Sequence, residues 1–151
     1  MRFIQRFLAL ILFSANAFAL SPAVPVIPAE FRGRWSPTKN ALGKAYSAKE
    51  QALQCRSKDP FRDVDTDIYP LEVSASNITF ASFVAGYKIR VLQITASSPD
   101  EIQGIGNIEE WEEGVADTPP MRQTDFRLKR SANTLVHTIG KDTRFYFTRC
   151  K

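Results

Sequence analysis

The reactive side chains of this sequence are few. It contains two cysteines, Cys55 and Cys150, and a single histidine, His137. Thiolates and imidazoles serve as nucleophiles, bases or metal ligands, but a zinc site needs three or four such ligands. His137 lies between Val136 and Thr138 in a strand-like run, and the chain lacks the G-x-S-x-G nucleophile elbow. We therefore predict no catalytic residue, no metal site and no cofactor, and we interpret His137 as an ordinary strand residue.

A first group of carboxylates has the spacing of a calcium loop. Asp63, Asp65 and Asp67 occupy every second position. In a calcium-binding loop of this type the sixth position is Gly and the twelfth is Glu, whereas here they are Ile68 and Ser74. We interpret the segment as a solvated acidic loop.

A second acidic cluster surrounds a tryptophan. It consists of Glu109, Glu110, Trp111, Glu112 and Glu113. Four carboxylates around an exposed aromatic ring can bind a basic partner. Alternatively, the cluster is the solvated end of a strand, with Trp111 directed into the core and the basic residues 127–130 opposite it across the sheet. An enzyme would instead need a pair such as Glu110 and Asp125 to converge in a cleft.

The first 19 residues have the layout of a secretory signal peptide. Arg2 and Arg6 form a positive segment, residues 7–13 an apolar run too short to span a bilayer, and residues 17–19 (A-F-A) a cleavage site. We predict cleavage after Ala19 and export to the periplasm or the medium. No membrane anchor is expected after cleavage.

Export changes the expected role of the cysteines. An oxidising compartment favours pairing of the only two thiols, so we predict a Cys55–Cys150 disulfide. In the chain-entropy treatment, closing a loop of roughly a hundred residues stabilises a fold by about 4–5 kcal/mol. The disulfide would withdraw both thiols from catalysis and from metal binding.

Length and charge restrict the remaining possibilities. Cleavage would leave 132 of the 151 residues, enough for one domain with a modest core. We place this domain at residues 31–151, behind an extended Pro-rich lead-in at residues 20–30. The net charge of +4 becomes +2 without Arg2 and Arg6. This small positive balance favours neither nucleic acid nor a polybasic membrane-binding face.

Most of the mature chain reads as short strands. Residues 41–54 are the exception, because their Ala, Lys, Glu, Gln and Leu content predicts a short amphipathic helix that ends at Cys55. Alternating apolar residues between turn residues predict strands at 31–35, 69–73, 77–84, 87–96, 101–111, 124–130, 134–139 and 143–150. Ala85-Gly86 is expected to be a turn, and Gly104 and Gly106 are expected to be bulge or bend sites.

This pattern predicts an all-β fold. We expect a small up-and-down antiparallel barrel of about eight strands, with one short helix after the first strand. The disulfide would bring the two ends of the barrel together. Five bulky residues are expected to fill its interior: Phe80, Leu92, Ile94, Phe126 and Phe145.

The segment around Trp35 resembles two known groups of proteins. Gly33-Arg34-Trp35 resembles the G-x-W signature that opens the first strand of lipocalins. The wider layout, from the signal peptide through a Pro-x-x-Phe-x-Gly-x-Trp start to the closing Arg149-Cys150, resembles small bacterial periplasmic proteins that have no assigned activity. The lipocalin resemblance implies that Trp35 closes one end of the barrel under an arginine from the end of the chain. Arg149 and Arg144 are the candidates, and we expect Arg149.

These residues together favour a non-enzymatic exported β-barrel that binds a protein partner or a small apolar ligand. A barrel filled by bulky residues would bind at its surface, so the 109–113 cluster is the first candidate site. The alternatives are a structural envelope protein and a small hydrolase that uses paired carboxylates. The sequence leaves open whether the barrel has an internal cavity.

Overall fold

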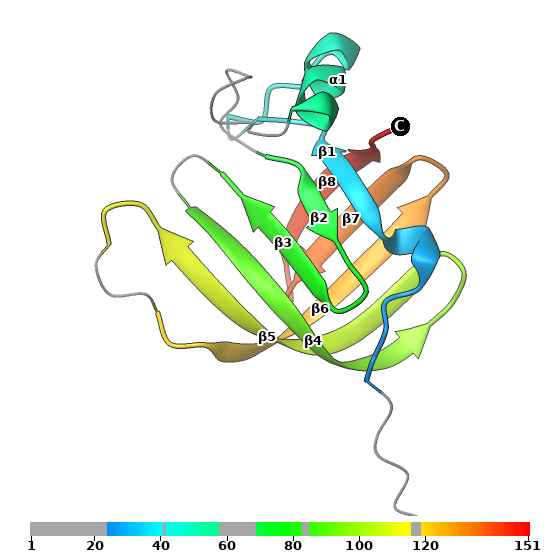
Figure 1. Ribbon diagram of the computed structural model, residues 1–151, viewed down its shortest axis with the longest axis vertical. Helices are drawn as coiled ribbons and strands as arrows, with labels where there is room; N and C mark the ends of the chain where they lie inside the picture. The colour runs from blue at the N-terminus through cyan, green and yellow to red at the C-terminus, as the bar shows by residue number, and fades with distance from the viewer. Residues whose placement is uncertain (1–23, 41, 58–68, 83–84, 116–118) are drawn as a thin grey trace, which may run out of the picture.

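The barrel predicted from the strand pattern is present. The computed structural model describes residues 24–40, 42–57, 69–82, 85–115 and 119–151. Its eight strands form one closed antiparallel barrel, in which each strand pairs with the next and β1 pairs with β8 (Figure 1). The strands are β1 (Gly33–Pro37), β2 (Leu71–Val73), β3 (Asn77–Ala81), β4 (Ala85–Ser97), β5 (Glu101–Glu112), β6 (Arg122–Ser131), β7 (Thr134–Ile139) and β8 (Thr143–Arg149).

The up-and-down order gives the barrel two different ends. The β2–β3, β4–β5 and β6–β7 connections lie at one end, together with the 3-10 helix η1 (Ala29–Phe31), and we call this the closed end. The β3–β4, β5–β6 and β7–β8 connections lie at the other end, which we call the mouth. Alternation along each strand separates core from surface; in β6, Phe126 is buried between exposed Asp125 and Arg127.

The chain enters the barrel through η1 rather than directly as a strand. We expected the first strand to begin at Phe31, but it begins at Gly33, whose φ of +118° is a conformation that residues with a side chain rarely adopt. Phe31 is instead fully buried at the closed end. The N–H of Ile27 donates to the carbonyl of Ala75 and fixes the lead-in to the β2–β3 connection.

The helix after β1 is shorter than expected. α1 spans Ala48–Arg56 instead of starting near residue 41. Gly43, at φ +79°, lies in a turn ahead of it, and Leu42 is 91% exposed. Ser47 and Glu50 form a reciprocal capping box, which satisfies the free N–H groups of the first turn and sets the start of the helix. No helix among the described residues is long and apolar enough to cross a membrane.

Two turn and bulge assignments need correction. Ala85 and Gly86 lie in β4 rather than in a turn, and the connection before them is closed by Ser82, whose N–H donates to the carbonyl of Ala85. The bulges lie on β4 and not at the glycines of β5, which lie opposite them. The register of β4 shifts between Val91 and Gln93 and again between Ile94 and Ala96. The first bulge leaves Leu92 39% exposed, so the expectation that it fills the barrel is wrong.

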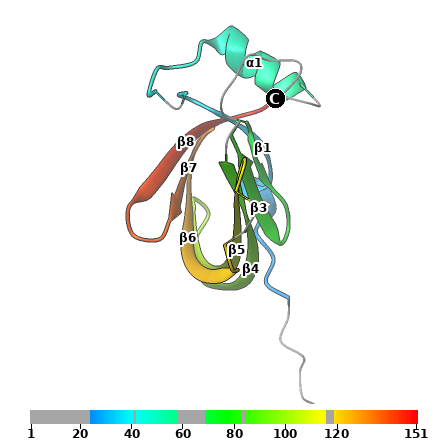
Figure 2. The same cartoon turned by 90° about the vertical axis from the view of Figure 1, so that its left-hand side faces the viewer.

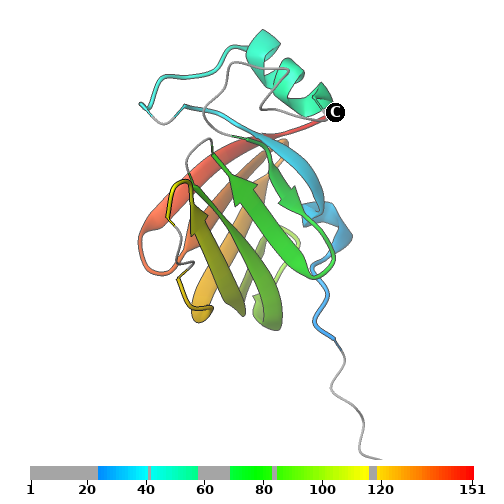
Figure 3. The ribbon, with the colours of Figure 1, turned by 60° about the vertical axis from the view of Figure 1, so that its left-hand side comes forward.

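The core fills the barrel from the closed end upward. Trp35 and Phe31 are fully buried there, and Ile78, Ile89 and Leu128 continue the core through the wall strands. Phe80 and Phe126 are buried as expected, while Ile94 and Phe145 pack against the core from partly exposed positions. Helix α1 lies outside the barrel, beside the end of β8 (Figures 1 and 3).

Candidate binding site at the barrel mouth

The closed end is sealed by Arg149. Its Cζ lies 4.8 Å from the ring centroid of Trp35, its partner in the β1–β8 register. Its Nη1 and Nη2 donate to the carbonyls of Glu30 and Arg32 at 2.6 and 2.9 Å. The indole Nε1 of Trp35 donates to the carbonyl of Phe31 at 3.0 Å. Arg149 therefore joins the last strand to η1 over the tryptophan, which leaves the opposite end as the place to look for a ligand.

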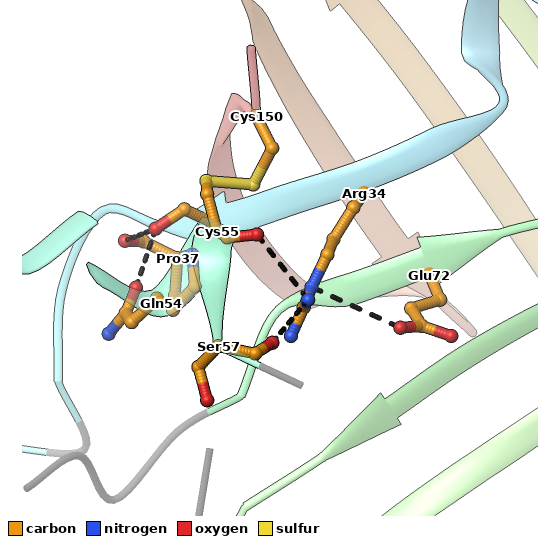
Figure 4. The surroundings of a disulfide bond; sticks show 8 residues. Arg34, Pro37, Gln54, Cys55, Ser57, Glu72 and Cys150 are labelled. Carbon is orange, nitrogen blue, oxygen red and sulfur yellow. Dashed lines mark hydrogen bonds and ion pairs between the residues drawn. A yellow bond between two sulfur atoms is a disulfide. The ribbon is translucent and has the colours of Figure 1, made fainter. Parts of the chain in front are cut away.

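The predicted disulfide is confirmed. Cys55 in α1 is bonded to Cys150, directly after β8, with the two Cα atoms 5.3 Å apart (Figure 4). Beside it, Arg34 Nη1 donates to the carbonyl of Ser57 at 2.6 Å, and Ser36 Oγ donates to the side chain of Gln54. Both hydrogen bonds join β1 to the C-terminal end of α1. Together with the disulfide, they hold α1 against the seam, the place where β1 pairs with β8 and closes the barrel.

The mouth has an aromatic floor. Phe80 of β3 lies between Tyr87 of β4 and Phe145 of β8, with ring centroids 5.3 and 5.1 Å away. These residues share the inward face because they alternate with exposed positions on their strands. They come together because the β3–β4 and β7–β8 connections both lie at the mouth. The floor is aromatic and apolar, with the Tyr87 hydroxyl as its polar atom.

Trp111 lies at the rim of the mouth: it shares the outer face of β5 with Glu109, two residues earlier, and it also lines a cleft at the mouth. It is 38% exposed, so the interpretation that directs it into the core is wrong. Its ring lies against Gly86, where an added Cβ would come within 2.2 Å of the ring, so only glycine leaves the indole this space. Glu110, the neighbouring residue on β5, is the cross-strand partner of Tyr87 and accepts two hydrogen bonds from Arg122 at 3.1 and 3.2 Å.

The described residues line two clefts at the mouth, and Phe80 and Phe145 line both. One, of about 400 Å³, lies toward β5 and is also lined by Tyr87, Glu110, Trp111 and Glu112. The other, of about 330 Å³, lies toward the segment after β1 and is also lined by Pro37, Asn40, Arg144 and Phe147. The larger cleft combines the aromatic floor with part of the acidic cluster. Glu109 lies outside it, on the outer face of the barrel beside Lys88.

A polar pair crosses the barrel below the floor. His137 of β7 is completely buried, and its Nδ1 lies 2.9 Å from the hydroxyl of Tyr87. Burial lowers the pKa of His137 to about 3 and raises the pKa of Tyr87 well above its usual range, so both groups are neutral at pH 7. His137 is in a strand as expected, but reasoning from the sequence missed its inward direction. The available signal was Leu135, an apolar residue two positions earlier and therefore on the same face of the strand.

The two carboxylates that an enzyme would need to pair, Glu110 and Asp125, do not come together. Glu110 is on the inward side of β5, whereas Asp125 is exposed on the outer face of β6 opposite Ile105, so these carboxylates do not converge. Residues 127–129 lie opposite 101–103, with Arg127 Nε 3.4 Å from Glu101, so the basic residues 127–130 do not lie opposite the acidic cluster as one interpretation had it. Residues 63–67 lie outside the described residues, among which no group of three or more potential metal ligands occurs.

The chain was compared with known protein families, curated proteins and solved structures. No protein-family model, curated protein or solved structure matches the chain. The case for a function therefore rests on the geometry of the mouth.

Proposed function

We propose that this protein is an exported, non-enzymatic binding module whose mouth receives a cationic side chain from a basic protein partner. One observation carries the proposal: Trp111, Glu110 and Glu112 line the same cleft as the aromatic rings of Phe80, Tyr87 and Phe145. Aromatic faces and carboxylates both attract a guanidinium or an ammonium group, and such a contact is worth about 0.5–2 kcal/mol per ring. The export part of the proposal rests on the signal peptide and on the disulfide.

The chain already shows how a guanidinium fits this edge. Arg122 of β6 places its Nη2 within 3.2 Å of both carboxylate oxygens of Glu110. Glu112 is two residues further along β5, on the same side of the strand as Glu110. It forms no ion pair with any residue that the structure describes. A partner's arginine or lysine can therefore use Glu112 and the face of Trp111 without displacing Arg122.

The second candidate is a small apolar ligand in the same clefts. Their volumes of about 330 and 400 Å³ are at the lower end of the range for small-molecule sites. Their apolar lining favours such a ligand, but neither reaches the filled interior around Ile89 and Leu128. Native mass spectrometry of protein purified from its own source distinguishes the two candidates, since a retained small molecule and a retained protein differ in mass.

A titration tests the favoured candidate directly. The probe is a short peptide with several arginines and no acidic residue, and an equally long peptide with glutamates is the control. We expect binding of the arginine peptide that weakens at least about tenfold in a Trp111→Ala/Glu112→Gln variant, because one ring contact and one ion pair are lost. The matched control, Glu30→Gln/Glu72→Gln, removes two carboxylates outside the mouth and should bind normally. Equal binding by all three proteins would exclude the mouth as the site.

A further inference from the structure

A basic groove lies on the outer wall of the barrel, and it shares Arg144 and Tyr146 with the smaller mouth cleft. It runs over β6, β7 and β8, which lie side by side (Figure 2). Its hollow measures about 690 Å³. We define the basic groove by six outward residues: Arg127, Lys129, Thr138, Lys141, Arg144 and Tyr146. Asp125 is the only acidic residue that lines the described part of this hollow.

Three of its four cations form no ion pair among the described residues. Arg127 is 3.4 Å from Glu101, but Lys129, Lys141 and Arg144 form no ion pair with any residue within the described ranges. All three are exposed. Elsewhere on the described surface, Arg34, Arg122 and Arg130 each have an acidic partner, whereas Lys88 and Arg90 on β4 form no ion pair with a described residue and do not line this hollow. The groove therefore concentrates unneutralised positive charge on a protein whose overall charge is small.

The strand register orders these side chains into two rows. Arg127, Thr138 and Arg144 are successive cross-strand neighbours, and so are Lys129, Val136 and Tyr146. In the first row a hydroxyl lies between two guanidinium groups, whose backbones are two strand spacings apart, about 9.5 Å. Guanidinium groups bind sulfate, phosphate and carboxylate oxygens with paired hydrogen bonds. The second row adds an ammonium group and the ring of Tyr146, which is 53% exposed.

We propose that the basic groove binds an anionic oligosaccharide. Such a chain carries acidic groups at intervals comparable to the separation of Arg127 and Arg144, and hydroxyl groups that can pair with Thr138. Its sugar faces can lie on the Tyr146 ring. A single inorganic anion would leave most of the hollow unfilled. Single-stranded nucleic acid needs a succession of aromatic rings for its bases, and Tyr146 is the one exposed aromatic residue in the described lining.

The test compares probes and variants by calorimetry. The probes are a heparin-derived hexasaccharide, neutral maltohexaose, sodium sulfate and a DNA hexanucleotide. The variant Lys129→Gln/Arg144→Gln removes one cation from each row. The matched control, Lys88→Gln/Arg90→Gln, removes the same charge from exposed positions on β4. Thermal melting confirms that each protein is folded.

We expect the heparin hexasaccharide to bind, maltohexaose and sulfate to bind far more weakly, and the groove variant to lose affinity at least about tenfold while the control keeps it. Equal losses in the two variants would mean non-specific attraction and would overturn the proposal. Equally tight binding of DNA would also overturn it. So would a self-associated protein, seen by sedimentation, that the groove variant dissociates, because the acidic mouth of a second copy would then be the occupant. These outcomes do not depend on the larger mouth cleft, which carries the proposed function, because that cleft is lined by neither Lys129 nor Arg144 and the groove variant leaves Trp111 and Glu112 unchanged.

Discussion

Trp35 and Arg149 lie directly opposite each other across the seam where β1 and β8 close the barrel. The arginine covers the indole ring at 4.8 Å and donates to two carbonyls of the η1 segment. The Arg149 side chain thus forms one cation–π contact and two charge-assisted hydrogen bonds.

Removing this side chain should destabilise the fold. We expect Arg149→Ala to lower the free energy of unfolding by about 3 kcal/mol, because a cation–π contact and two charged hydrogen bonds are lost. Trp35 emission should shift to longer wavelength as water reaches the ring. Arg90→Ala, an exposed arginine on β4, is the control and should change neither property. Unchanged melting and emission in Arg149→Ala would show that the closure does not depend on this contact.

The closed end also shows what the sequence predicts well and what it does not. The order of the strands and of the helix followed from alternation and turn residues, and the disulfide followed from two thiols behind a predicted signal peptide. The start of β1 was misplaced because Phe31 reads as a strand residue, whereas it is the last residue of η1, a segment that receives long-range hydrogen bonds from Arg149 at the carbonyls of Glu30 and Arg32. Local pattern fixes the type of an element better than its boundaries.

The mouth was harder to predict for a similar reason. The acidic cluster was visible in the sequence, but the position of the Trp111 ring over β4 depends on the absence of a side chain at Gly86, 25 positions earlier. The Tyr87–His137 pair joins strands that are not neighbours in the sheet. Alternation assigns a residue to a face, but it does not say which inward residues meet across a barrel.

The disulfide should carry a large part of the stability. It closes a loop with a sequence separation of 95, and the chain-entropy treatment assigns about 4–5 kcal/mol to such a loop. We expect a Cys55→Ala/Cys150→Ala variant to unfold at a clearly lower urea concentration. The reference is the parent protein with its disulfide intact, measured in the same buffer without reductant. A variant with the parental midpoint would show that Arg34 and Gln54 hold the helix on the seam without the bridge.

The buried histidine should make stability depend on pH. Its pKa is about 3 in the folded protein and about 6.5 in an unfolded chain, so the unfolded state binds more protons between these values. Stability is therefore complete above about pH 6.5 and falls by about 1.4 kcal/mol per unit as the pH decreases toward 3. Between pH 7 and 5, before the carboxylates titrate, this slope should appear in urea midpoints of the parent protein.

A substitution separates this effect from others. His137→Gln keeps a hydrogen-bonding group near Tyr87 but does not titrate. The variant is expected to be less stable at pH 7 and to lose most of the slope between pH 7 and 5. An unchanged slope would assign the dependence to another group.

Gly104 should resist substitution for reasons of space. An added Cβ would lie 2.4 Å from the carbonyl of Gln93 and 2.6 Å from the ring of Phe126. We expect Gly104→Ala to lower the free energy of unfolding by about 1–3 kcal/mol, the usual range for overpacking. Asn107→Ala on the outer side of the same strand is the control and should be mild. Equal melting temperatures for the two variants would contradict the close approach of β4 and β6 over this glycine.

The two tryptophans allow the most direct test of binding at the mouth. Trp111 lines the larger cleft, whereas Trp35 is fully buried at the closed end with its Nε1 donating to Phe31. In a ¹⁵N-labelled sample, each indole N–H gives its own resonance. On titration with the arginine-containing peptide, the account predicts that the Trp111 indole signal moves and saturates while the Trp35 signal stays in place. An unmoved Trp111 signal at saturating peptide would contradict the assignment of the mouth as the binding site.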